Sequence, residues 1–128
     1  MSLRSPLARV SYHGAARDGV GHWWAQRVTA SALAPLSAWL LVALLTLPAS
    51  DYTAVTAWIG AGWNPVLLAL TVLLACWHSW LGVQVIIEDY VHSPGRKTAG
   101  LLLSMGAHAL LAASGIYAVL RIALRSAA

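Results

Sequence analysis

Residues 65–90 read PVLLALTVLLACWHSWLGVQVIIEDY, and this stretch contains no charged side chain before Glu88. A bilayer core about 30 Å thick requires about 20 apolar residues at a rise of about 1.5 Å per residue. Proline is tolerated in a first helical turn. We therefore expect a transmembrane helix over residues 65–87, with His78 near its middle.

Two further runs on either side of this stretch lack Asp, Glu, Lys and Arg, and they predict spans over residues 28–47 and 98–120. Gly100, Gly106 and Gly115 in the last run are small enough to permit close helix packing in lipid. The sequence predicts an all-α membrane protein with three transmembrane helices.

Two segments fall outside the three spans. We expect residues 1–27 to form an N-terminal arm on the cytoplasmic side, followed by a membrane domain over residues 28–128. Residues 52–64 are rich in glycine and precede a proline. They are expected to form a loop at the bilayer surface, with Trp58 and Trp63 as anchors at the level of the headgroups.

The composition excludes a water-soluble domain. Charged residues make up 9% of the chain, against about 25% in ordinary soluble domains. Basic residues favour the cytoplasmic side of a membrane, and most of them flank one side of the predicted spans. That side carries Arg4, Arg9, Arg17, Arg27, Arg96 and Lys97, whereas the other side carries Arg121 and Arg125.

This asymmetry predicts a cytoplasmic N-terminus and a periplasmic C-terminus. It also accounts for the basic pI of about 9.9 without a nucleic-acid partner. The single cysteine, Cys76, rules out a disulfide framework within the chain. We expect a bacterial inner membrane protein rather than a mitochondrial one, because the N-terminal region lacks the features of a full transit segment.

Two histidines are predicted to lie at similar depth within the membrane. Ionisable groups there are costly and are functional-site candidates by default. A neutral imidazole can ligate a metal, including haem iron, or can hydrogen-bond to a neighbouring helix. His78 is flanked by Trp77 and Trp80, and Gly82 one turn later leaves room for a bulky planar group. For His108 we expect a bond between helices, with ligation as the alternative.

Polar residues near the cytoplasmic end of the second span suggest a second site. Asp89 lies eleven residues after His78, which is about three helical turns and about 16 Å along the same face. With Tyr90 it could hydrogen-bond a quinone carbonyl and relay protons. The alternative is an ordinary membrane boundary. Arg27 could bind an anionic ligand or act as a snorkelling anchor, and Gln84 is expected to contact another helix.

The stretch HSWLGVQVIIEDYV, residues 78–91, resembles the second-helix signature of the hydrophobic membrane-anchor D subunit of succinate dehydrogenase, respiratory complex II. The leader HWWAQRVTA, residues 22–30, is similar to the entry into that family's first helix. The third span resembles the family only in length and hydrophobicity. The resemblance therefore covers the first two spans.

The resemblance implies a three-helix anchor that packs against a second three-helix anchor subunit, of the cytochrome b556 type. His78 would be one axial ligand of haem b, with the other from the partner anchor. Tyr90, with Asp89, would bind ubiquinone, and Arg27 would lie near the haem propionates or the quinone pocket. An iron–sulfur subunit and a flavoprotein subunit carrying FAD would be tethered to the membrane.

This chain would then catalyse nothing alone but would serve a succinate:ubiquinone oxidoreductase of the respiratory chain and tricarboxylic acid cycle. Two alternatives stay open at this point. One is the anchor of a fumarate reductase, and the other is a structural membrane protein without a catalytic role. Ligation of one haem by both His78 and His108 would be the arrangement of single-anchor relatives, which have five spans.

Overall fold

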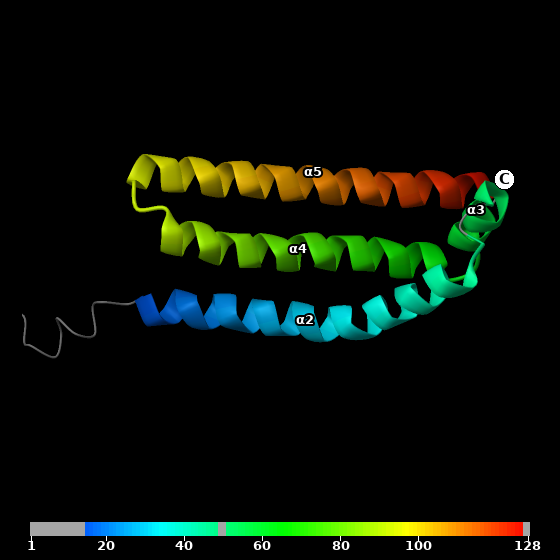
Figure 1. Cartoon of the computed structure of the whole chain (residues 1–128), viewed down its shortest axis with the longest axis horizontal. Coiled ribbons are helices and arrows are strands. Elements are labelled where there is room, and N and C mark those ends of the chain that lie inside the picture. Colours follow the sequence, from blue (N-terminus) through cyan, green and yellow to red (C-terminus); the bar gives the residue numbers. More distant parts are fainter. Residues whose placement is uncertain (1–14, 49–50, 127–128) are drawn as a thin grey trace, which may run out of the picture.

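The computed structural model describes residues 15–48 and 51–126, with side chains described over 19–48 and 51–125. This part of the chain is all-helical and contains no strand. Its helices are α2 (Ala15–Thr46), α3 (Tyr52–Gly60), α4 (Asn64–Tyr90) and α5 (Pro94–Ser126), shown in Figure 1. The all-α prediction is confirmed.

Three of the helices are long and apolar enough to cross a membrane: Gly19–Thr46 within α2, all of α4, and Pro94–Arg125 within α5. The prediction of three spans is confirmed, although each helix extends beyond its apolar run. α2 begins at Ala15, so residues 15–27 of the predicted arm are helical, whereas residues 1–14 lie outside the described residues. A helix satisfies its own backbone hydrogen bonds, so it can continue past the hydrocarbon boundary at no cost.

The prediction of a loop over residues 52–64 was wrong, because most of this segment is the short helix α3. The Asp51 carboxylate caps it by accepting hydrogen bonds from the backbone N–H groups of Thr53 (2.9 Å) and Ala54 (3.1 Å). Such a cap satisfies N–H groups that have no partner inside the helix. The Trp58 ring stacks on Trp39 of α2 at a centroid distance of 5.5 Å, which ties α3 to the first span.

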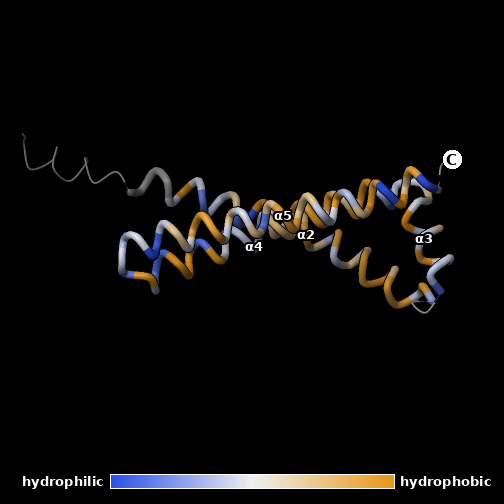
Figure 2. The backbone as a smooth tube through the Cα atoms, turned by 90° about the horizontal axis from the view of Figure 1, so that it is seen from above, coloured by the Kyte–Doolittle hydropathy of each residue, from blue (hydrophilic) through white to orange (hydrophobic). Residues whose placement is uncertain are grey.

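The three long helices form a row in chain order, with α4 between α2 and α5 (Figure 1). α4 packs against both neighbours, whereas the backbones of α2 and α5 do not approach each other within the described residues. α3 lies at one end of the row, where it contacts α4 and α5. The second half of α2 diverges from the other two long helices (Figure 2). Pro35 lies inside α2, and an internal proline removes one helical hydrogen bond and bends the helix.

Glycine packing brings α4 and α5 together. A Cβ atom at Gly115 would lie 2.8 Å from Cγ1 of Val72, and one at Gly100 would lie 3.5 Å from Cγ2 of Ile87. The predicted role in close packing is therefore confirmed at these two positions. At Gly106 no such neighbour lies within 4 Å of the added Cβ in the described residues, so packing at this position stays a prediction.

Very little of the described chain is buried. The buried residues are Thr29, Ala43, Thr71, Leu81 and Val119. Large apolar side chains such as Leu45 and Leu103 are about three-quarters exposed. A row of helices with this surface suits lipid and neighbouring helices rather than water.

Candidate functional site

His78 points from α4 towards α2, and both of its ring nitrogens are engaged there. Nδ1 lies 2.9 Å from Oγ1 of Thr29, a side chain that is only 2% exposed. The Thr29 hydroxyl already donates its one proton within α2, to the carbonyl oxygens of Ala25 (2.8 Å) and Gln26 (3.1 Å). With that proton engaged inside α2, we assign the hydroxyl oxygen as the acceptor from His78, with the ring proton on Nδ1 and a lone pair on Nε2.

The Nε2 lone pair faces the side-chain amide of Gln26. Gln26 Nε2 lies 3.3 Å away and donates to it. The other amide atom, Gln26 Oε1, is buried and has no hydrogen-bond partner in the described part of the chain. In this tautomer, turning the amide over would place Oε1 against the lone pair, so a flip alone does not satisfy the oxygen. A buried oxygen without a hydrogen-bond partner lowers the stability of the fold. We therefore expect a further hydrogen-bonding group at this position.

A groove continues from this pair along α2 and α4. It has a volume of about 730 Å³, and His22, Gln26, Gly82 and Glu88 are among the residues that line it. The His22 ring donates from Nε2 to the carbonyl oxygen of Leu81 at 3.2 Å. A Cβ at Gly82 would lie 3.8 Å from Gln26 Nε2, so the glycine leaves space beside the Gln26 amide that contacts His78.

These residues fit one side of a haem site. Haem iron is ligated by a neutral imidazole nitrogen, and the other ring N–H of a ligating histidine is usually held by an acceptor. His78 has both features, because Thr29 holds Nδ1 and Nε2 is the nitrogen that could ligate iron. In the described residues no group of three or more His, Cys, Asp or Glu side chains converges as a metal cluster.

His108 is on the other side of α4. Its Nε2 lies 3.1 Å from Oγ of Ser79, and its Nδ1 lies 2.7 Å from the carbonyl oxygen of Ser104 in its own helix. The expected hydrogen bond between helices is therefore present. Neighbouring residues on a helix point about 100° apart. His78 therefore hydrogen-bonds to α2, whereas Ser79 hydrogen-bonds to α5.

Trp77 and Trp80, which flank His78 in the sequence, line a separate cavity of about 200 Å³ with His108 and Met105. Gln84 lines the groove between α2 and α4, and its Nε2 donates to Oε1 of Glu88 within α4 at 2.9 Å.

The residues predicted for quinone binding lie where α4 ends. Tyr90 is the last residue of the helix, and its side chain is 78% exposed. Asp89 is also exposed. The Lys97 ammonium donates to the carbonyl oxygen of Glu88 at 2.7 Å, which fixes the turn into α5. Both predicted residues are thus open to a partner at this boundary.

Arg27 is exposed, and its guanidinium lies 5.2 Å from the centroid of the Trp23 ring. This contact has the geometry of a cation–π interaction. The structure does not bring Arg27 into the groove beside His78. Its predicted role near an anionic group stays a prediction.

Sequence reasoning missed Gln26 and Thr29 as partners of His78. The signal was present in the spacing, because His22, Gln26 and Thr29 follow one another at four and three residues. Such positions share one helix face, and polar residues on one face of a span require a partner. The structure shows that this partner is α4.

Three spans in a row, with a buried polar contact between the first two, define a small multi-pass membrane subunit. A family model described as "Succinate dehydrogenase/Fumarate reductase transmembrane subunit" matches residues 1–116. The chain belongs to this family.

Relatives within the family are named as anchors. The chain is 35% identical over 90 residues to the succinate dehydrogenase hydrophobic membrane anchor subunit of Rickettsia conorii, covering 70% of this chain and 71% of the relative. It is 40% identical over 86 residues to the succinate dehydrogenase membrane anchor subunit of Reclinomonas americana, covering 64% and 69%. The anchor subunit of Paracoccus denitrificans is 28% identical over 111 residues, covering 87% and 85%. No solved structure matches the chain.

Proposed function

We propose that this chain is the hydrophobic anchor of a succinate:ubiquinone oxidoreductase in a bacterial inner membrane. It would tether the flavoprotein and iron–sulfur subunits and contribute residues to a haem b site and a ubiquinone site. The observation that carries this proposal is the His78 ring, with Nδ1–H held by Thr29 and Nε2 directed at a buried amide. The names of the relatives favour succinate dehydrogenase over fumarate reductase.

His78 would supply one axial ligand through Nε2. Thr29 would hold the ring in the tautomer that leaves this nitrogen free, and Gln26 would have to turn its amide away from Nε2. Gly82 would leave space for the flat group. The second ligand would come from a second three-helix anchor subunit. When bound, haem b would supply a one-electron carrier in the membrane.

Tyr90 and Asp89 would form this chain's part of the quinone pocket. The phenol can donate a hydrogen bond to a quinone carbonyl, and the neighbouring carboxylate can hold or pass a proton at the membrane boundary. Both side chains are exposed at the end of α4, where a soluble subunit could cover them. The N-terminus would be cytoplasmic, on the same side as this pocket.

The test is a reduced-minus-oxidised absorbance spectrum of the purified complex. We expect His78→Ala to lose the b-type haem signal while the other subunits still co-purify. His108→Ala is the matched control, because it removes an intramembrane imidazole on the other face of α4, and it should keep the signal. Loss of haem in the His108 variant with retention in the His78 variant would refute the ligand assignment.

A further inference from the structure

The end of the bundle that carries α3 has a polar groove that the haem and quinone roles do not use. It has a volume of about 400 Å³ and lies where α3 meets the last turns of α5. Its polar lining comes from Arg121 and Arg125 of α5, Tyr52 and Thr56 of α3, and Tyr117. The groove therefore combines two positive charges with hydroxyl groups.

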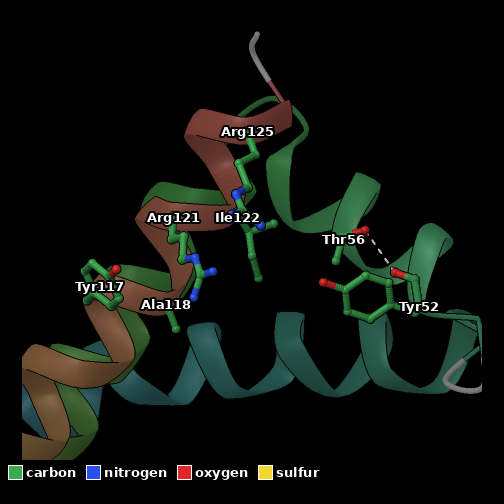
Figure 3. A pocket seen from close by; sticks show the side chains of 7 residues that line it. All are labelled: Tyr52, Thr56, Tyr117, Ala118, Arg121, Ile122 and Arg125. Atoms are coloured by element: carbon green, nitrogen blue, oxygen red, sulfur yellow. Dashed lines mark hydrogen bonds between the residues drawn. The ribbon is translucent and has the colours of Figure 1, made fainter.

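The two guanidinium groups are one helical turn apart on the same face of α5, and both are exposed. Figure 3 shows Arg121 and the Tyr52 hydroxyl directed into the space between α5 and α3, with Arg125 entering it from the end of α5. Within the described residues neither arginine takes part in a hydrogen bond or an ion pair. Their hydrogen-bond donors are thus available.

Among the described residues that line the groove, none carries a carboxylate to offset these charges. The chain has four acidic residues, and of these only Asp51 lies near α3. Its Oδ1 accepts the two backbone N–H groups that cap α3. Glu88 and Asp89 are at the far end of α4, and Asp18 is in the first turns of α2. The groove consequently keeps an excess of positive charge.

The groove lies at the level where a membrane surface is expected. The apolar span of α5 ends at Arg125, and Trp63, which is 77% exposed, lies at the same end of the bundle. Tryptophan and arginine at helix ends are typical of the headgroup layer. Ala118 and Ile122 give the groove an apolar wall beside the arginines.

We propose that this groove binds the phosphodiester of an anionic phospholipid, with the two guanidinium groups on its oxygen atoms and the Tyr52 hydroxyl as a further donor. Arginine pairs with phosphate through two parallel hydrogen bonds, which gives geometric specificity beyond charge. The apolar wall favours a lipid over free phosphate. The groove shares no residue with the groove at Gln26 and lies at the other end of the bundle from Tyr90, so it does not depend on the proposed haem and quinone roles.

The experiment uses the purified complex containing the full chain, reconstituted into nanodiscs of phosphatidylcholine with or without phosphatidylglycerol. After mild extraction, native mass spectrometry counts the phospholipids that stay bound. The variants are Arg121→Gln, Arg125→Gln and the double substitution. Arg96→Gln is the matched control, since it removes one exposed arginine at the other end of the bundle. Arg121→Lys keeps the charge but loses the fork-shaped donor pair.

We expect each glutamine variant to lower retention of phosphatidylglycerol about fivefold, as loss of one basic contact to an anionic lipid predicts. The double variant should lose the lipid, Arg121→Lys should be intermediate, and Arg96→Gln should be unchanged. Equal retention in all variants, or an equal loss in Arg96→Gln, would overturn the proposal. Displacement of the bound lipid by inorganic phosphate at an equal concentration would also overturn the proposal. So would loss of a partner subunit when either arginine is replaced, because that result would indicate that a carboxylate of the partner occupies the groove.

Discussion

A single hydroxyl proton on Thr29 determines what His78 can do. With that proton used inside α2, the oxygen is assigned as the acceptor from the histidine ring, and Nε2 keeps its lone pair. An aliphatic residue at position 29 would leave the tautomer undetermined. The hydroxyl thus acts as a positioning group for the proposed ligand.

Replacing Thr29 by Val keeps the shape of the side chain and removes the acceptor. We expect the affinity for haem b to fall about 10–100-fold, which is the usual cost of losing a partner that orients a metal ligand. Titration of the haem-depleted complex with haem, followed by absorbance, measures this. Thr29→Ser retains the hydroxyl and should bind haem nearly as well as the original chain. If the Val and Ser variants bind equally, the hydroxyl does not orient the ring.

Tyr90→Phe removes only the phenolic hydroxyl of an exposed side chain. One hydrogen bond contributes about 1 kcal/mol, so we expect kcat/KM for ubiquinone to fall roughly fivefold. Succinate oxidation with a soluble artificial acceptor, which bypasses the quinone, should stay unchanged in the same preparation. Unaltered ubiquinone kinetics would remove Tyr90 from the pocket.

At the scale of the helices, α4 has a packed neighbour on each side in the described part of the chain, and two adjacent residues of α4 form side-chain hydrogen bonds to the two neighbours. His78 bonds to α2 and Ser79 is bonded by His108 of α5. The approach of α5 depends on Gly115, whose missing side chain admits Val72. Polar contacts and small residues together hold helices in lipid, where apolar side chains gain nothing by avoiding water.

Gly115→Ala should push α4 and α5 apart. Valine is stiff about its Cα–Cβ bond, so Val72 cannot easily move away from a Cβ at 2.8 Å. Overpacking of this kind costs about 1–3 kcal/mol, and thermal unfolding of the complex in detergent should show a lower midpoint. Gly106→Ala is the control, because its Cβ meets no neighbour and alanine favours a helix. Equal midpoints for the two variants would contradict this account of the packing.

The sequence predicted the spans well because charge-free runs follow directly from the thickness of the bilayer. It could not predict that α2 begins at Ala15, because residues at a membrane surface tolerate both helix and loop. It also missed α3, whose only local signal is the capping residue Asp51. His78 was identifiable from its depth, whereas its orientation by Thr29 depended on how α2 packs against α4.

On the scale of the whole molecule, the chain exposes most of its large apolar side chains. The predicted orientation of this row in the bilayer depends on the basic residues near Arg96 and in the N-terminal region. The positive-inside tendency applies to lysine and arginine residues in short connections between spans. The α4–α5 connection is short, so its basic residues are expected to face the cytoplasm. The two ends of the row should accordingly face different compartments.

Cysteine labelling can test this orientation. In a Cys76→Ser background, Gly95→Cys marks the α4–α5 connection and Ala61→Cys marks the opposite end, and both positions are exposed. A reagent that does not cross the membrane should label residue 61 in intact cells and residue 95 only after the inner membrane is opened. The reverse pattern would show that the N-terminus is periplasmic.

The agreement between chain order and spatial order has a consequence for synthesis. Since α2, α4 and α5 stand side by side in the order in which they leave the ribosome, each new span meets its neighbour as soon as it enters the bilayer. No span has to wait for a later one or to pass around an earlier one. The Thr29–His78 contact can therefore form before α5 enters the bilayer, so orientation of the histidine does not depend on the third span.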